Sequence, residues 1–344
     1  MKLNLIKALL PALFFTQITL AEEVVNFYNW ADYIGESTIR DFEKEYGIKV
    51  NYDEYDSSEI VEAKLLAGNS GYDLVVHSSM YSKRLMPLKI FHEIDPAKLS
   101  NYERLDPMLM EMLDEIDSGN KIMIPYSYGS TGVSYDAKKI FARDPNPPIG
   151  SADMLYDAET ISKFADCGIS ILDSPTDVVP QALVYLGYDD SSKDPKELQE
   201  AEDLLHEARP YIKKFTSSTL LNDLANGDVC IAMSWAGDYA TASARAKEAG
   251  KDIDLRYFVP EEGGLLWVDI IVIPKDAKNI ENAYLLLDYL LRPEVSADFV
   301  NLTHYASPVP EAKAFIKEEV LNDTAVYPTP EIMDRLFFTE VDPP

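Results

Sequence analysis

Alternating strand and helix patterns in residues 24–76 constrain the fold of this chain more than any other feature. Short β-branched and aromatic stretches, typical of strands, alternate with two segments whose apolar side chains recur at helical spacing. The first helix is expected to stop at Gly47 and the second at Gly68. This β-α-β-α-β order predicts an α/β fold with a parallel sheet and helices on its faces. The strands are expected at residues 24–29, 48–55 and 72–76, and the helices at 36–46 and 56–68.

Three loops after predicted strands have an unusual content. Residues 29–33 read NWADY, residues 78–81 read SSMY, and residues 234–238 read SWAGD. Ligands of parallel α/β sheets bind outside the carboxyl ends of the strands, where such loops meet. We therefore expect these three loops to contribute to one ligand-binding crevice.

The amino-terminal residues resemble a signal peptide. Lys2 and Lys7 form a basic start, residues 8–15 are an apolar run too short to span a bilayer, and residues 19–21 (TLA) resemble a cleavage site. We expect residues 1–21 to be removed and the mature protein to be exported to a bacterial periplasm. No cysteine follows the cleavage site, so no lipid anchor is expected there.

The charge balance excludes several classes of partner. The 344 residues include 59 acidic and 31 basic side chains, which give a net charge of −28. A nucleic-acid-binding protein needs a basic surface for the phosphates, and an anionic membrane surface would repel this chain. The charge permits the attraction of cationic ligands.

The two cysteines, Cys167 and Cys230, form an isolated pair. In an oxidising compartment such a pair favours a disulfide over a metal site, which would need more ligands. Two buried free thiols are the alternative.

Sequence motifs of common enzymes are absent: the chain has no P-loop, GxGxxG, GxSxG or HExxH motif. The four histidines are far apart and have no metal-ligand spacing. We therefore expect no enzymatic activity, no cofactor and no metal.

Each of the three tryptophans lies close to an aspartate, near a junction between a strand and a loop. Tryptophan faces attract cations and cover methylene groups, and a carboxylate accepts charge-assisted hydrogen bonds from an ammonium group. Aromatic faces and separated carboxylates together favour a ligand with an alkyl chain and ammonium ends. The three pairs are Trp30 with Asp32, Trp235 with Asp238, and Trp267 with Asp269.

From about residue 24 to residue 337, the chain resembles the bacterial periplasmic polyamine-binding proteins, the putrescine and spermidine receptors of ABC importers. The resemblance rests on YNWADY at 28–33, GYDLVV at 71–76, NDLANGDVC at 222–230, WAGD at 235–238 and YLLRP at 289–293. It implies a two-lobed type II solute-binding fold with parallel-sheet lobes that close by hinge motion. It also implies a disulfide between Cys167 and Cys230.

The resemblance further implies the ligand contacts. Asp269 and Asp238 would hold one amine, Asp177 or Asp32 another, and the aromatic side chains would enclose the methylene chain. Met80 departs from the polar or aromatic residue usual in the family, and Ala31 replaces a hydroxyl residue. The expected ligand-binding set is Trp30, Asp32, Tyr33, Ser78, Met80, Asp177, Trp235, Asp238, Trp267, Asp269 and Tyr305.

We expect residues 22–128 and 270–306 to form the first lobe, and residues 129–269 and 307–344 the second. The predicted function is delivery of a putrescine- or spermidine-type polyamine to an inner-membrane ABC permease by a monomer. One alternative is a sensor that reports polyamine to a membrane signalling receptor. A more distant one is an exported hydrolase that uses an aspartate pair.

Overall fold

The computed structural model describes residues 23–339, so the predicted signal peptide at residues 1–21 lies outside the described residues. The described chain begins with the predicted β-α-β-α-β unit, and β1 pairs in parallel with both β2 and β3. The expected strands and helices of this unit are therefore confirmed. They are β1 (Val24–Trp30), α1 (Thr38–Tyr46), β2 (Lys49–Tyr55), α2 (Ser58–Leu66) and β3 (Leu74–Ser78).

The sheet as a whole is mixed, whereas the strands inside each lobe pair in parallel, as expected. Strand β9 (Gly264–Val272) is antiparallel to β3, and β4 (Ile124–Asp136) is antiparallel to both β9 and β7 (Ile231–Trp235). The physical reason is that β4 carries the chain out of the first lobe and β9 carries it back. The strand order is β2-β1-β3-β9-β4-β7-β5-β6, with β8 paired to β4 and β10 to β9.

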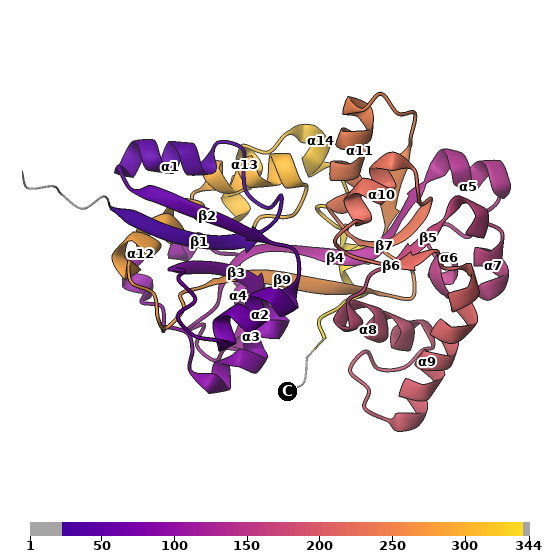
Figure 1. The fold of residues 1–344 in the computed structure, drawn as a ribbon, viewed down its shortest axis with the longest axis horizontal. Helices are drawn as coiled ribbons and strands as arrows, with labels where there is room; N and C mark the ends of the chain where they lie inside the picture. Colours follow the sequence, from indigo (N-terminus) through magenta and orange to yellow (C-terminus); the bar gives the residue numbers. More distant parts are fainter. Residues whose placement is uncertain (1–22, 340–344) are drawn as a thin grey trace, which may run out of the picture.

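The remaining elements cover the two ends of this sheet. Figure 1 shows the first lobe with α1–α4, α12 and α13, and the second lobe with α5–α11, on either side of the passage made by β4 and β9. The other helices and strands are α3 (Ser79–Leu85), α4 (Pro107–Asp114), α5 (Ala137–Arg143), α6 (Asp153–Tyr156), α7 (Ala158–Ser162), β5 (Ile169–Ile171), α8 (Pro175–Tyr185), α9 (Pro195–Ala208), β6 (Lys214–Phe215), α10 (Leu220–Asn226), α11 (Asp238–Glu248), β8 (Leu255–Phe258), α12 (Ile280–Leu290), α13 (Pro293–Thr303), α14 (Glu318–Leu321), α15 (Pro330–Met333) and β10 (Leu336–Phe337). Short 3-10 helices lie at Met86–Leu88, Pro96–Lys98, Tyr102–Arg104, Ala165–Cys167, Arg209–Tyr211 and Pro310–Ala314.

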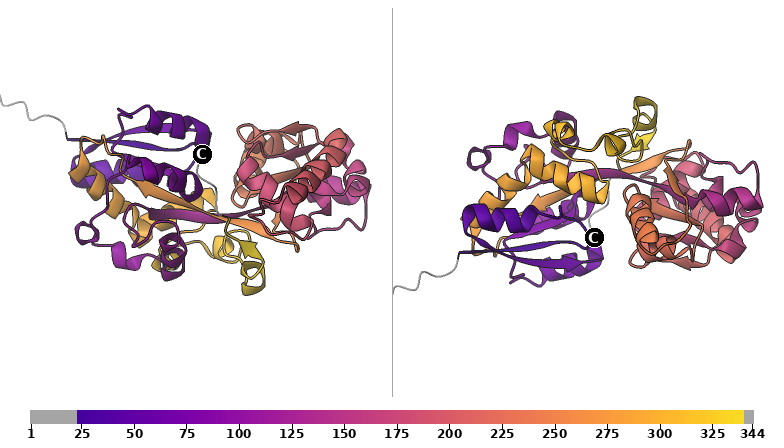
Figure 2. Two further views of the ribbon diagram at one scale, coloured as in Figure 1. Left: turned by 90° about the horizontal axis from the view of Figure 1, so that it is seen from below. Right: turned by 90° about the horizontal axis from the view of Figure 1, so that it is seen from above.

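Each lobe has its own hydrophobic core. The first core includes Phe27 and Leu109, and the second includes Phe164 and Ile231, all fully buried. The lobes are therefore separate packing units joined by a shared sheet. Figure 2 shows the two lobes from below and from above, with the long strands running between them.

Three segments cross between the lobes side by side. On the first-lobe side β9 pairs with β3 from Asp269 onward, and on the second-lobe side β4 pairs with β7 from Thr131 onward. Between these points β4 and β9 pair with each other, and Tyr128 exchanges two backbone hydrogen bonds with Ala306. The lobe boundaries at residues 128–129, 269–270 and 306–307 stay a prediction, and these pairings are the crossings on which it rests.

The described carboxyl-terminal residues, 307–339, contact both lobes, so their assignment to the second lobe stays a prediction. Their buried apolar side chains between Val309 and Val326 lie in the first core. The segment also contacts the second lobe, where the Tyr239 hydroxyl of α11 donates to Asp323 and Leu336 of β10 pairs with Gly264 of β9. The apolar spacing of this segment carries no information about which core it covers.

Cys167 and Cys230 form a disulfide that joins the start of β7 to the short helix before β5. The predicted bridge is confirmed, and the alternative of two free thiols is wrong. In residues 23–339, no helix combines the length and the apolar character that a membrane crossing requires.

Candidate functional site

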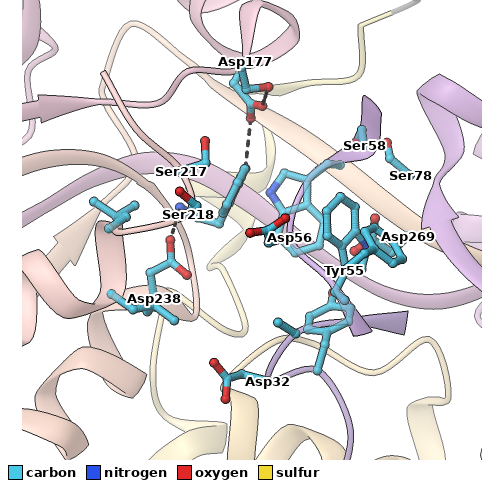
Figure 3. Close-up of a pocket in the computed structure, with 18 of the residues that line it drawn as sticks. Asp32, Tyr55, Asp56, Ser58, Ser78, Asp177, Ser217, Ser218, Asp238 and Asp269 are labelled. Atoms are coloured by element: carbon cyan, nitrogen blue, oxygen red, sulfur yellow. Dashed lines mark hydrogen bonds between the residues drawn. The ribbon is translucent and has the colours of Figure 1, made fainter. Parts of the chain in front are cut away.

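A cavity of about 290 Å³ lies between the two lobes. This volume suits a small molecule and is too small for a folded partner. Figure 3 shows aspartate and serine side chains placed around it from several elements. The lining residues are Trp30, Ala31, Asp32, Tyr33, Tyr55, Asp56, Ser58, Ser78, Met80, Tyr81, Ser174, Thr176, Asp177, Ser217, Ser218, Leu220, Leu221, Asn222, Trp235, Asp238, Thr241, Arg245, Trp267, Asp269 and Tyr305.

All eleven residues of the expected ligand-binding set line this one cavity. The first lobe contributes the loop after β1, the end of β3 and the start of α3; the second contributes α8, the end of β7 and the start of α11. The crossing segments contribute Trp267, Asp269 and Tyr305. The structure thus brings together side chains that are far apart in the sequence. Their role in binding stays a prediction.

Sequence reasoning missed several lining residues. Tyr55 ends the predicted strand at 48–55 and Asp56 follows it, so the rule that identified the other crevice loops could have found them. Arg245 lies two helical turns after Asp238, on the same face of α11. The serines and threonines of the second lobe had no local signal, because hydroxyl residues are common in all surface loops.

Asp177, in the first turn of α8, is held by three donors. Its Oδ1 accepts hydrogen bonds from the Thr131 hydroxyl at 2.6 Å and the Trp235 indole at 3.2 Å, and its Oδ2 accepts one from the Ser174 hydroxyl at 2.6 Å. Burial raises the pKa of Asp177, and these three donors oppose the rise. Asp177 therefore fixes the orientation of the Trp235 ring and places a buried acidic group beside it.

Asp238 begins α11 and connects the second lobe to the third crossing segment. Its Oδ1 accepts a hydrogen bond from the Tyr305 hydroxyl at 2.8 Å, and its Oδ2 accepts one from the Trp235 amide at 3.1 Å. Burial raises the pKa of Asp238 to about 6, although both donors and the Arg245 guanidinium oppose the rise. This carboxyl group therefore titrates close to neutral pH.

Asp269 lies on β9 directly opposite Ser78 of β3. Burial raises the pKa of Asp269 to about 7, the Asp177 carboxylate adds to the rise, and the Tyr33 hydroxyl opposes it. Among residues 23–339, no lysine, arginine or histidine forms an ion pair with Asp269. Asp269 is thus a buried acidic group that no cation of residues 23–339 neutralises.

Aromatic rings form the walls of the cavity. The Trp267 and Tyr305 rings meet edge to face with centroids 5.4 Å apart, and Tyr305 makes a second such contact with Tyr33 at 5.3 Å. On the other side, Trp30 packs on Tyr55 at 4.4 Å. These contacts hold the rings in place before a ligand arrives, so their faces can contact an alkyl chain at a low entropic cost.

Charge in the lining is strongly one-sided. Within the described part of the chain, five lining residues are aspartates and one, Arg245, is basic. A ligand with carboxylate or phosphate groups would meet five aspartates and, among the described lining residues, a single cation, Arg245. No group of three or more His, Cys, Asp or Glu residues within 23–339 is arranged to hold a metal ion. The arrangement therefore suits an organic cation with an apolar middle.

Two lobes around a ligand-sized cavity define a solute-binding protein. The profile of the bacterial extracellular solute-binding protein family matches residues 37–329, and the chain belongs to that family. The chain is 41% identical over 316 residues to the putrescine-binding periplasmic protein SpuD of Pseudomonas aeruginosa, a match that covers 92% of this chain and 86% of that protein.

Two further comparisons agree. The chain is 41% identical over 330 residues to the putrescine-binding periplasmic protein PotF of Escherichia coli, covering 95% of this chain and 89% of that one. The solved structure of the spermidine/putrescine ABC transporter substrate-binding protein PotD from Streptococcus pneumoniae has a TM-score of 0.77 at 29% identity, covering 93% and 94% of the two chains. The expected family and the two-lobed type II fold are confirmed.

Proposed function

We propose that this protein is a periplasmic receptor that binds a linear polyamine between its lobes and delivers it to an ABC permease. The observation that carries the proposal is Asp269, a buried carboxyl group without an ion-pair partner in the described chain, in a cavity walled by aromatic rings. A buried acidic group without a cation is costly unless a cation arrives with the ligand.

The ligand's ends and its middle would be recognised by different groups. Asp269 and Asp238 would accept hydrogen bonds from one ammonium group, and Asp177 would attract another. The rings of Trp30, Trp235, Trp267 and Tyr305 would cover the methylene chain between them. Each cation–aromatic contact is worth about 0.5–2 kcal/mol, so several together contribute substantially to affinity.

Delivery to a permease is the output that the relatives support. SpuD and PotF are named as periplasmic putrescine-binding proteins, and the Streptococcus pneumoniae structure is named as part of an ABC transporter. A signalling receptor would also need a ligand-dependent closed surface, and no feature of the described chain favours that output over transport.

We also propose that a single chain is sufficient to bind the ligand, and that it leaves the ligand chemically unchanged. One chain supplies residues from both sides of the cavity, so a monomer is sufficient to enclose the ligand. The acidic groups there are held by hydroxyl and indole donors or lie beside aromatic rings, an arrangement suited to holding cations. Incubation of the protein with polyamines and N-acyl polyamines, followed by mass spectrometry, should return them unchanged.

Titration calorimetry with diamines of graded length and with spermidine tests the central proposal. The protein should first be dialysed extensively to remove any ligand that co-purifies. We expect saturable binding of at least one di- or triamine, and much weaker binding of butylamine, which has the alkyl chain but one ammonium group. Absence of measurable binding of every polyamine at millimolar concentration would contradict the proposal.

A further inference from the structure

Arg245 is the one basic side chain that lines the cavity within residues 23–339. It lies on the face of α11 that also presents Asp238 and Thr241 to the cavity, at helical spacings of three and seven residues. This face therefore carries an acidic group at its inner end and a fixed positive charge two turns further out.

The guanidinium of Arg245 joins the two lobes. Its Nη2 donates to Oδ2 of Asp32 at 2.6 Å, and its Nη1 donates to Oδ1 of Asn222 at 3.3 Å. Asp32 belongs to the first lobe, in the loop after β1, whereas Arg245 and Asn222 belong to the second. The Arg245–Asp32 pair is half exposed, with side-chain exposures of 33% and 58%, so it lies at the mouth of the cavity.

Asp32 is held in this position by its own backbone. Its φ of 58° is in the left-handed region, and its amide donates to Oε1 of Glu54 at 3.3 Å. The carboxylate of Asp32 is thus directed toward Arg245, and the guanidinium already neutralises its charge. An ion pair this exposed contributes little to the free energy of unfolding. We therefore expect its main effect on whether an ammonium group of a ligand can bind Asp32.

The acidic groups of the cavity consequently differ in availability. Asp177, Asp238 and Asp269 are buried and none is paired with a cation in the described chain, whereas Asp32 is occupied. Figure 3 shows Asp32 at the opposite end of the drawn pocket from Asp177. A ligand long enough to place an additional ammonium group at the Asp32 end would meet the Arg245 guanidinium there.

We propose that Arg245 is a specificity-determining residue that occupies Asp32 as a built-in cation, closes the mouth of the cavity, and so disfavours polyamines with an additional ammonium group relative to diamines. This inference rests on the proposed function and deepens it. Without the guanidinium, the carboxylates of Asp32, Glu54 and Asp56 near the mouth are free to attract a third ammonium group.

Calorimetry of putrescine and spermidine with three variants tests the inference. In Arg245→Gln, the ratio of the putrescine Kd to the spermidine Kd should rise at least fivefold over the wild type. The double variant Asp32→Asn/Arg245→Gln should return the ratio to within twofold of the wild type, because the liberated carboxylate is gone. Lys247→Gln removes the same charge from an exposed position of α11 outside the cavity lining and should leave the ratio unchanged.

Each outcome separates the inference from the proposed function. If the wild type binds no polyamine, the proposed function fails and the inference falls with it. If the wild type binds, a ratio in Arg245→Gln within twofold of the wild type overturns the inference alone. Equal weakening of putrescine and spermidine binding in Arg245→Gln would show that the ion pair only stabilises closure. Persistence of the raised Kd ratio in the double variant would show that Asp32 is not its cause. Either result also overturns the inference.

Discussion

Gly129 lies directly opposite Trp267 in the pairing of β4 with β9, and a Cβ atom placed on Gly129 would be 2.5 Å from Cζ2 of the indole. The glycine therefore leaves the space in which the ring lies against the strand. A ligand-facing wall of the cavity thus depends on the absence of a side chain on the neighbouring strand.

Gly129→Ala should displace the Trp267 ring and weaken polyamine binding by about tenfold, roughly the loss of one cation–aromatic contact. The double variant Gly129→Ala/Trp267→Phe should bind more tightly than Gly129→Ala, because phenylalanine lacks the outer indole atoms that meet the new methyl group. Calorimetry measures both. Wild-type affinity in Gly129→Ala would show that the ring position does not matter for binding.

Asp269→Asn should weaken polyamine binding at least tenfold without unfolding the protein. The amide has nearly the same shape, so the main loss is the negative charge that would face the ammonium group. Asp203→Asn, an exposed position on α9, makes the same chemical change away from the cavity and should bind normally. Circular dichroism checks the fold, and equal affinities for the two variants would remove Asp269 from the site.

Polyamine affinity should fall by about tenfold when the pH is lowered from 8 to 6. The pKa of Asp269 is raised to about 7, so about nine in ten such groups are ionised at pH 8 and about one in ten at pH 6. A protonated carboxyl group cannot pair with an ammonium group. Calorimetry in buffers of different ionisation enthalpy should show proton release on binding near pH 6, and its absence would contradict this coupling.

The same shift predicts the pH dependence of the ligand-free protein. Because burial raises the pKa of Asp269 to about 7 and that of Asp238 to about 6, the folded state holds more protons than the unfolded state between pH 4 and these values. The free energy of unfolding should therefore decrease as the pH rises through this range. Urea unfolding at several pH values measures it, and saturating polyamine should reduce the decrease.

Removal of the Cys167–Cys230 disulfide by a double alanine substitution should lower the free energy of unfolding by about 2–4 kcal/mol. The bridge closes a segment with a sequence separation of 63 residues, entirely within the second lobe. Polyamine affinity should stay within twofold of the wild type, because neither cysteine lines the cavity. A large loss of affinity with intact fold would show that the bridge also shapes the cavity.

The sequence was informative where local pattern and chemistry agree. Trp30, Asp32 and Tyr33 could be placed in the crevice because they follow a predicted strand of β-branched and aromatic residues. By contrast, the strand Ile124–Asp136 was hidden, because its serines and glycines have low strand propensity and its pairing partner β9 lies more than 120 residues further along the chain. For these residues, the sequence predicted only that the chain crosses from one lobe to the other.

Arg245 illustrates the other limit of sequence reasoning. It lies on α11, but its partner Asp32 lies 213 residues earlier, in the other lobe. An arginine on a helix is usually solvated, so nothing local distinguishes it from Lys247. Only the relative placement of the two lobes, which no local pattern encodes, brings the guanidinium to the mouth of the cavity.

The antiparallel pairing of β4 with β9 has a mechanical consequence. Because both lobes are built on the same two hydrogen-bonded strands, one lobe can change its position relative to the other only if the backbone of this ribbon bends or twists. The resistance of these paired strands to bending and twisting therefore limits how the lobes can move. The distance between spectroscopic labels on α2 and α10 should report on this movement.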